Sequence, residues 1–271
     1  TADAAKFYAV SDLKIGLLSM SFMIVYLVVS IPASWIIDTY GIRTGVGAGV
    51  VLTGVFGFLR GMTHGDFNLL LLTQVGIAVG QPFILNAITK IAARWFPIEE
   101  RATASGLGTL SIYLGILIGM ILTPHLVVGS GMNGMLHFYG ILSVASAALF
   151  LVFIRERPLS APCPPEQEER ALAVDGLKMI FRNRDFLRLM VIFFIGLGIF
   201  NAVTTWIEDI LRPHGFSAVQ AGTIGGVMII GGILGALIIP ILSDRYRKRT
   251  GFLVLALAGA SVSLIGVTFG T

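Results

Sequence analysis

Charged residues are scarce in this chain. Asp, Glu, Lys and Arg make up 13% of its 271 residues, whereas a soluble domain carries roughly 25%. So few charges cannot cover a globule with polar surface, and 55% of the residues are hydrophobic. The apolar side chains must therefore face lipid, and the composition predicts an integral, multi-pass membrane protein.

Motifs for enzymatic or metal chemistry are also lacking. The chain has one cysteine, Cys163, which offers no disulfide framework, and its four histidines stand apart without metal-ligand spacing. Neither a phosphate-binding Gly-x4-Gly-Lys-[Ser/Thr] loop nor a Gly-x-Ser-x-Gly nucleophile elbow occurs. We therefore predict no catalytic residue, no metal and no cofactor, and a protein that is not an enzyme.

What the chain has instead is eight apolar runs, each long enough to span a bilayer, which takes roughly 17–25 residues. The runs carry no strand-like alternation and are rich in glycine, which membrane helices tolerate. They cover residues 15–37, 44–62, 67–92, 103–127, 134–154, 186–211, 219–242 and 251–270. The sequence thus predicts an all-α membrane protein, with Ser11 or Asp12 capping the first spanning helix.

Basic residues are concentrated in alternate loops. The loops after the first, third, fifth and seventh runs hold 15 of the 19 Lys and Arg residues, and the other side holds four. Such an excess marks the cytoplasmic side, so the net charge of +4 is not taken as a nucleic-acid signal. We expect the loops at Asp38 and Asp244 to be cytoplasmic, in a plasma (inner) membrane protein.

These two polar loops repeat one pattern. In each, a Tyr follows two residues after the Asp and an Arg follows five residues after it, which gives Arg43 and Arg249. The two Asp residues are 206 positions apart, with six apolar runs between equivalent points. A six-helix period indicates a transporter built from two parallel halves.

The repeat also divides the chain. We expect residues 1–154 to form an N-terminal transmembrane half (helices 2–6), 155–185 a cytoplasmic linker, and 186–271 part of a C-terminal half (helices 7–9). By this count, the first helix and the last three helices of the full fold are absent from the sequence.

The loops resemble the signature of the major facilitator superfamily, in which a small residue precedes an Asp that is followed by a basic residue, a Gly and further basic residues. The first copy has Ser34 in place of Gly and Thr39 and Ile42 in place of basic residues, and the second has Arg247 in the Gly position. The resemblance implies the major facilitator fold of two six-helix halves, here seen as about eight helices, and secondary transport by alternating access.

A narrower resemblance covers most of the chain. Residues 18–43, 80–96, 198–205 and 221–245 are similar to the feline leukaemia virus subgroup C receptor-related branch. That branch includes transporters of choline and ethanolamine and proteins linked to haem export. In the family an aromatic cage holds the quaternary ammonium, with a Gln of the fourth helix nearby. Gln81 matches that Gln, whereas the seventh-helix Tyr of the cage falls at Asn201. The resemblance implies a choline-like organic cation as the solute.

Five residues are candidates for solute binding. Gln81 and Asn201 lie near the middle of their runs, where they either bind solute or join helices by hydrogen bonds. Tyr26 and Tyr113 are also at midspan, and a buried phenol needs a partner or a wet cavity. Trp206, nearer the outer surface, suits either an interfacial anchor or a cation–π contact.

A second set of residues is expected to control conformation. A carboxylate at a cytoplasmic helix end can pair with Arg and cap the next helix. These candidates are Asp38 with Arg43, and Asp244 with Arg245 and Arg249.

The role of one ionic site and two alternative functions stay open. Glu208 and Asp209 lie near the outer end of the sixth run, where they form a solvated helix end, a cation-attracting vestibule or a proton site. The glycines of the fourth run partly resemble the antiporter signature of drug exporters, which keeps proton-coupled efflux of a drug or metabolite as an alternative. The second alternative is a membrane receptor or scaffold without transport. As partners we expect a small-molecule solute and the lipid bilayer, no nucleic acid, and a monomeric protein.

Overall fold

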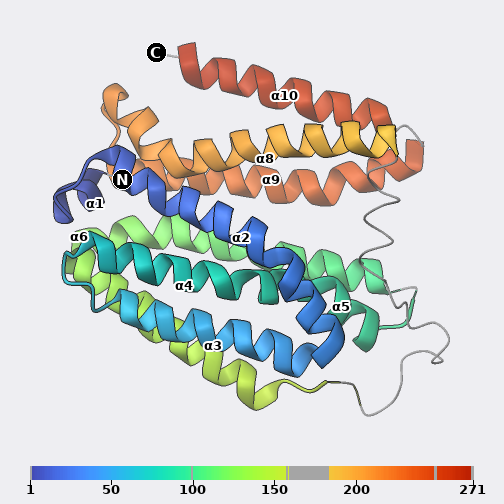
Figure 1. Cartoon of the computed structure of the whole chain (residues 1–271). Helices are drawn as coiled ribbons and strands as arrows, with labels where there is room; N and C mark the ends of the chain where they lie inside the picture. Colours follow the sequence, from blue (N-terminus) through green and yellow to red (C-terminus); the bar gives the residue numbers. More distant parts are fainter. Residues whose placement is uncertain (1, 99, 157, 159–182, 247–248, 270–271) are drawn as a thin grey trace.

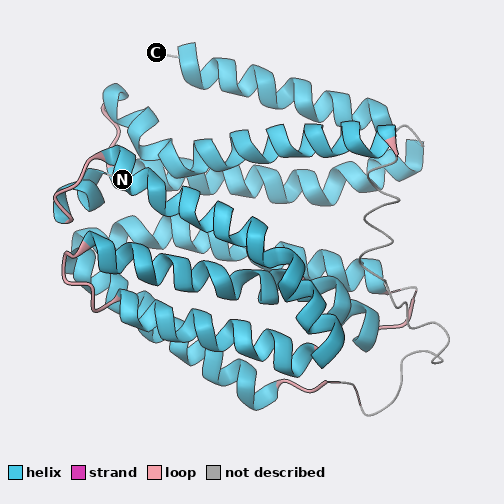
Figure 2. Ribbon diagram, in the orientation of Figure 1, coloured by secondary structure: helices cyan, strands magenta, loops and turns pink. Residues whose placement is uncertain are grey.

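A computed structural model describes residues 2–98, 100–156, 158, 183–246 and 249–269 of the chain. All regular structure in these residues is helical (Figure 2). Six of the described helices are long and apolar enough to cross a membrane. The all-α membrane fold predicted from the sequence is therefore confirmed. Most of the predicted linker over 155–185 lies outside the described residues.

The helices form two bundles (Figure 1). The first bundle comprises α1 (Ala2–Phe7), α2 (Asp12–Tyr40), α3 (Ile42–Arg60), α4 (Phe67–Leu85), α5 (Ala87–Trp95) and α6 (Arg101–Phe153). The second bundle comprises α8 (Arg184–Leu211), the 3-10 turn η2 (Arg212–His214), α9 (Ala218–Tyr246) and α10 (Arg249–Phe269). Successive spans run in alternate directions, so the last turns of α2, α5, α6 and α9 lie at one end, which we call the Asp38 end (Figure 1).

The chain reverses within α6. Gly131 has a φ of 71°, a left-handed conformation that Gly adopts without steric cost, and it joins two antiparallel spans. These spans are the predicted runs 103–127 and 134–154, and we call their junction the Gly131 end of the bundle. The predicted run 67–92 lies within one apolar span, Phe67–Trp95, in which Asn86 marks the boundary between α4 and α5. Ser11 caps α2 by accepting a hydrogen bond from the backbone N–H of Lys14 at 3.4 Å. Of the two residues predicted as alternative caps, Ser11 and Asp12, it is therefore Ser11 that caps the helix.

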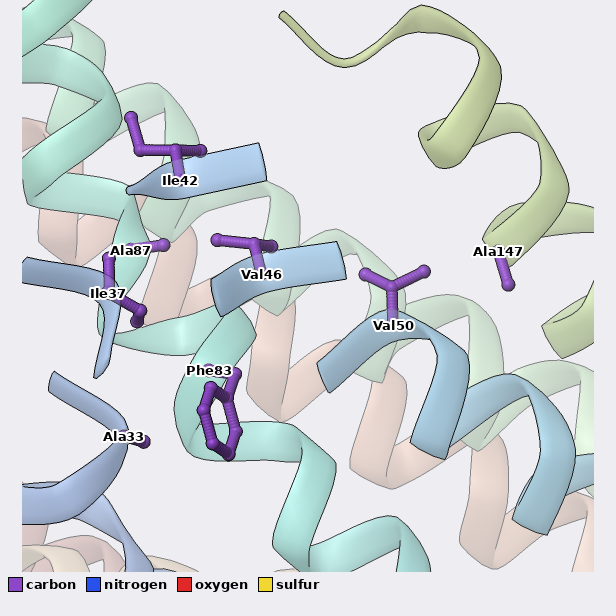
Figure 3. Packing of buried hydrophobic residues seen from close by; sticks show 8 residues of the cluster. All are labelled: Ala33, Ile37, Ile42, Val46, Val50, Phe83, Ala87 and Ala147. Carbon is purple, nitrogen blue, oxygen red and sulfur yellow. The ribbon is translucent and has the colours of Figure 1, made fainter. Parts of the chain in front are cut away.

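The core of the first bundle lies where α2, α3, α4, α5 and α6 meet. It consists of Ala33, Ile37, Ile42, Val46, Val50, Phe83, Ala87 and Ala147 (Figure 3). Small residues bring the helices together: a Cβ placed on Gly80 of α4 would lie 2.6 Å from the carbonyl oxygen of Gly49 on α3. Because lipid is as apolar as the side chains, such close packing, rather than hydrophobic burial, holds membrane helices together.

Candidate functional site: a polar ladder between two helices

A polar side chain lies within the third span, at the boundary between α4 and α5. Asn86 lies between α4 and α5, and its carboxamide reaches across to α2. Its Oδ1 accepts a hydrogen bond from the Tyr26 hydroxyl at 2.9 Å. Its Nδ2 donates to the hydroxyl oxygens of Ser30 and Ser34, each at 2.9 Å. The spacing from Gln81 indicates that Asn86 faces away from that residue, and the structure shows what it faces.

The same two helix faces carry further polar residues toward the Asp38 end. Lys90 follows Asn86 by one turn, and its Nζ donates to Asp38 Oδ1 at 2.5 Å and to the carbonyl oxygen of Ile37 at 2.8 Å. Residues four apart share a face of a helix, so a row on α2 meets a row on α5. We call this set the polar ladder; it consists of Tyr26, Ser30, Ser34, Asp38, Asn86, Lys90 and Arg94.

Glu156 closes the ladder at the Asp38 end. Its carboxylate accepts hydrogen bonds from the backbone N–H groups of Ile42 at 2.9 Å and Arg43 at 2.7 Å, and it forms an ion pair with Arg94. The first N–H groups of a helix lack partners within that helix and carry partial positive charge. Glu156, just beyond α6, therefore caps α3 and ties it to α5. Glu156 is not among the residues predicted from the sequence.

The structure changes the partner expected for Asp38. The carboxylate contacts Lys90 of α5, whereas Arg43 offers its backbone N–H to Glu156 and its side chain is exposed. The turn at Gly41 places Arg43 on the outer side of α3, while Asp38 faces α5. The predicted pair of Asp38 with Arg43 is thus replaced by a pair between helices. The second predicted set, Asp244, Arg245 and Arg249, has side chains that lie outside what the structure describes.

The predicted solute-binding residues lie in different settings. The Tyr26 hydroxyl is held by Asn86, and its ring stacks on Phe22 with centroids 6.1 Å apart. Asn201 donates from Nδ2 to the Leu197 carbonyl oxygen at 2.8 Å, within its own helix α8. Trp206 of α8 packs against α2 at the Gly131 end. Gln81 and Tyr113 are half-buried on α4 and α6. The described contacts do not assemble these five into one cage.

The predicted ionic site on α8 is partly neutralised by one arginine. Arg212 donates to Glu208 at 3.2 Å and to Asp209 at 2.5 Å. The three residues lie three and four positions apart on successive turns, a spacing at which opposite charges pair on a helix. That spacing in the sequence could have identified Arg212 as their partner.

A half-buried cation lies at the Gly131 end of the first bundle. Arg60 of α3 donates to Gln74 Oε1 of α4, and Gln74 Nε2 donates to the Leu18 carbonyl oxygen of α2 at 3.3 Å. The Nε atom of Arg60 is buried without a hydrogen-bond partner among the described residues. This bridge joins α2, α3 and α4 at the end remote from Asp38.

Comparison with known proteins agrees with this arrangement. Residues 2–271 match the profile of the family described as Major Facilitator Superfamily. The chain belongs to the Major Facilitator Superfamily. Its fold is that of the superfamily: the crystal structure of a bacterial homolog to the human lysosomal transporter Spinster, in an inward-facing and unoccupied conformation, matches with a TM-score of 0.73 at 19% identity. The match covers 90% of this chain and 57% of that one.

Relatives within the superfamily include proteins named as transporters. The chain is 32% identical to the choline/ethanolamine transporter FLVCR1 of Felis catus, over 93% of this chain and 49% of the relative. It is 30% identical to solute carrier family 49 member A3 of Xenopus tropicalis, over 96% of this chain and 58% of the relative. The resemblance noted from the sequence is thereby confirmed. The chain spans about half the length of the curated relatives it matches.

This superfamily member also has a lateral cavity of about 450 Å³ between α3, α4 and α6. It is lined by Val50 and Thr53, by Ile84, and by side chains of α6 between Tyr139 and Phe150. The lining is largely apolar, and none of the five predicted solute-binding residues contributes to it.

Proposed function

We propose that this protein is a secondary transporter, not an enzyme, that moves a small organic solute across the membrane by alternating access. The polar ladder supports this most directly. Polar side chains in a membrane span are costly and mark functional regions by default. Here they gather on the facing sides of α2 and of the third span, where Asn86 bonds to three α2 hydroxyl groups. Membership of the superfamily and the transporter names of the relatives point the same way.

The solute that we propose is a choline-like organic cation. A quaternary ammonium has no N–H to donate, so an aromatic face is the group that recognises it. The hydroxyl group of choline can form a hydrogen bond with a carboxamide, which both donates and accepts. Gln81 and Asn201 supply carboxamides, and Tyr26, Tyr113 and Trp206 supply rings. The relatives named as choline/ethanolamine transporters support this assignment.

The Asp38 end is the proposed site of conformational control. The ion pair of Asp38 with Lys90 and the contacts of Glu156 with Arg94 and α3 join α2, α3, α5 and the segment after α6. We propose that these contacts set the geometry of that bundle at its cytoplasmic end. Arg43, Asp244, Arg245 and Arg249 remain candidates for contacts made in another state. In this proposal residues 1–154 and 186–271 belong to two halves joined by 155–185, in a monomer of the plasma (inner) membrane.

Uptake of radiolabelled choline into proteoliposomes tests the proposal. We expect flux that saturates with choline concentration and is reduced by unlabelled ethanolamine. Gln81→Leu should raise the concentration for half-maximal flux about tenfold, the effect of about 1.4 kcal/mol of lost binding. Asn68→Leu is the matched control, because Asn68 is an exposed amide in the first turn of the same helix.

Three outcomes would contradict parts of this proposal. Tight choline binding without flux would favour a receptor over a transporter. Flux that follows an imposed pH gradient would favour proton-coupled efflux and would direct attention to Glu208 and Asp209. Saturable flux of other solutes but not of choline or ethanolamine would leave a transporter and reject the organic cation.

A further inference from the structure

A close contact joins the two bundles at the Gly131 end. Gly16 lies near the start of α2, and Trp206 lies near the end of α8. A Cβ placed on Gly16 would lie 2.9 Å from Cζ2 of the Trp206 indole, closer than real side chains approach. The indole therefore rests directly on the backbone of α2, and a side chain larger than hydrogen at position 16 would displace it.

A second contact between the bundles lies at the same end. Gly222 and Gly226, in the first turns of α9, face α6: a Cβ on Gly222 would lie 2.6 Å from the Met120 carbonyl oxygen, and one on Gly226 would lie 3.0 Å from Ile121. The buried face of α9 continues to Ile229, which is 1% exposed. The first turns of α9 thus pack closely against α6.

Toward the Asp38 end, the facing sides of α6 and α9 are no longer packed against the opposite bundle. Leu237, two turns beyond Ile229 on α9, is 50% exposed. On α6, Gly106 lies three turns before Leu117 and shares its face. A Cβ placed on Gly226, across the interface, would meet Leu117, whereas no described atom lies within 4 Å of a Cβ placed on Gly106. Figure 1 shows α2 and α8 diverging in the same direction. The bundles therefore touch at the Gly131 end and separate toward the Asp38 end.

We infer that Trp206 seated on Gly16 is the gate that closes the Gly131 end in this state, and that the close packing of α9 on α6 is the pivot about which the bundles move. The inference deepens the alternating-access transport proposed above and rests on it. Exposure of a central solute to the Gly131 end requires the indole to leave Gly16. Trp206 is therefore a positioning residue between the bundles, in addition to being a candidate ring for the solute.

Thiol labelling tests the gate without relying on transport. Cys163 is the only cysteine, so Cys163→Ser provides a cysteine-free background. Tyr113→Cys places the reporter on α6 one turn before Leu117, on the face turned toward α9. An impermeant methanethiosulfonate reagent is applied from the Gly131 side to sealed vesicles of one orientation. We expect Gly16→Val and Trp206→Ala each to raise the labelling rate about tenfold, a shift of about 1.4 kcal/mol.

Controls separate the gate from general loosening. Gly198→Val on α8 should leave the rate unchanged, because no described atom lies within 4 Å of a Cβ placed there. If Gly16→Val does not fold, Gly16→Ala replaces it. In a Trp206→Leu background Gly16→Ala should add little, because the ring it displaces is gone, and neighbouring residues couple in this way.

The labelling results test the gate independently of the transport assay. An unchanged labelling rate in both Gly16→Val and Trp206→Ala would overturn the gate. Equal increments from Gly16→Ala with the indole present and in the Trp206→Leu background would also overturn it, since the effect would then not require the indole. Labelling that responds as expected in a protein without saturable flux would reject the proposed transport while leaving the contact between bundles established.

Discussion

Replacing Glu156 should weaken the first bundle by a calculable amount. Its carboxylate caps α3 through the N–H groups of Ile42 and Arg43, which is worth about 0.5–2 kcal/mol. Its charge at the positive end of the helix adds about 0.3–1 kcal/mol. The pair with Arg94 is partly exposed, at 37% for the Glu156 side chain and 19% for Arg94, and adds about 0.2–1 kcal/mol. The three contributions sum to about 1–4 kcal/mol, and Glu156→Ala should therefore cost about 2.5 kcal/mol, the centre of that range.

Thermal unfolding in detergent, followed by circular dichroism, measures this cost. For domains of 150–250 residues each kcal/mol shifts Tm by about 2–4 °C, so Glu156→Ala should lower Tm by roughly 5–10 °C. Glu156→Gln keeps an oxygen that accepts from the backbone but loses the charge, so its shift should be about half as large. Arg188→Gln is the control: it breaks an ion pair with Asp185 whose side chains are 76% and 88% exposed, and Tm should hardly move.

The reasoning about Glu156 predicts an order as well as a size. Equal shifts for Glu156→Ala and Glu156→Gln would mean that the charge, and not the backbone cap, carries the effect. A shift for Glu156→Ala no larger than that of the Arg188→Gln control would refute the assignment of Glu156 as the residue that ties α3 to α5.

Three further changes test the rest of the site. Asp38→Asn, which removes the charge that pairs with Lys90, should lower the transport rate about fivefold, or by ~1 kcal/mol in the barrier, and leave the Kd for solute nearly unchanged; equal loss of rate and binding would contradict it. Asn86→Leu leaves three α2 hydroxyl groups without their partner and should destabilise by about 1–3 kcal/mol in the same thermal assay; an unaltered Tm would show that the ladder is not structural. Gln74→Leu leaves the Arg60 guanidinium without its acceptor, at a cost of about 1.5–3 kcal/mol. Adding Arg60→Met should recover part of that loss, and failure to recover any would contradict the bridge.

Part of the polar ladder could be predicted from the sequence. The four-residue spacing of Tyr26, Ser30, Ser34 and Asp38 is visible in the sequence, and it places them on one face of α2. The sequence does not show what that face contacts, because its partners Asn86 and Lys90 lie 52 to 60 residues away in the chain. Proximity in the sequence favoured Arg43 as the partner of Asp38, and the fold brings Lys90 there instead.

The spans themselves were predictable because lipid imposes a local rule. A membrane helix must satisfy its own backbone and be apolar over its length, so hydropathy alone located the predicted runs and the reversal between the two parts of α6. The paired loops at Asp38 and Asp244 likewise indicated the superfamily from the sequence. Only the tertiary structure decided which helix faces meet. Close approach at small residues such as Gly49 and Gly80, and at Gly16 beneath Trp206, sets those contacts, and it depends on shape between segments rather than on the composition of any one of them.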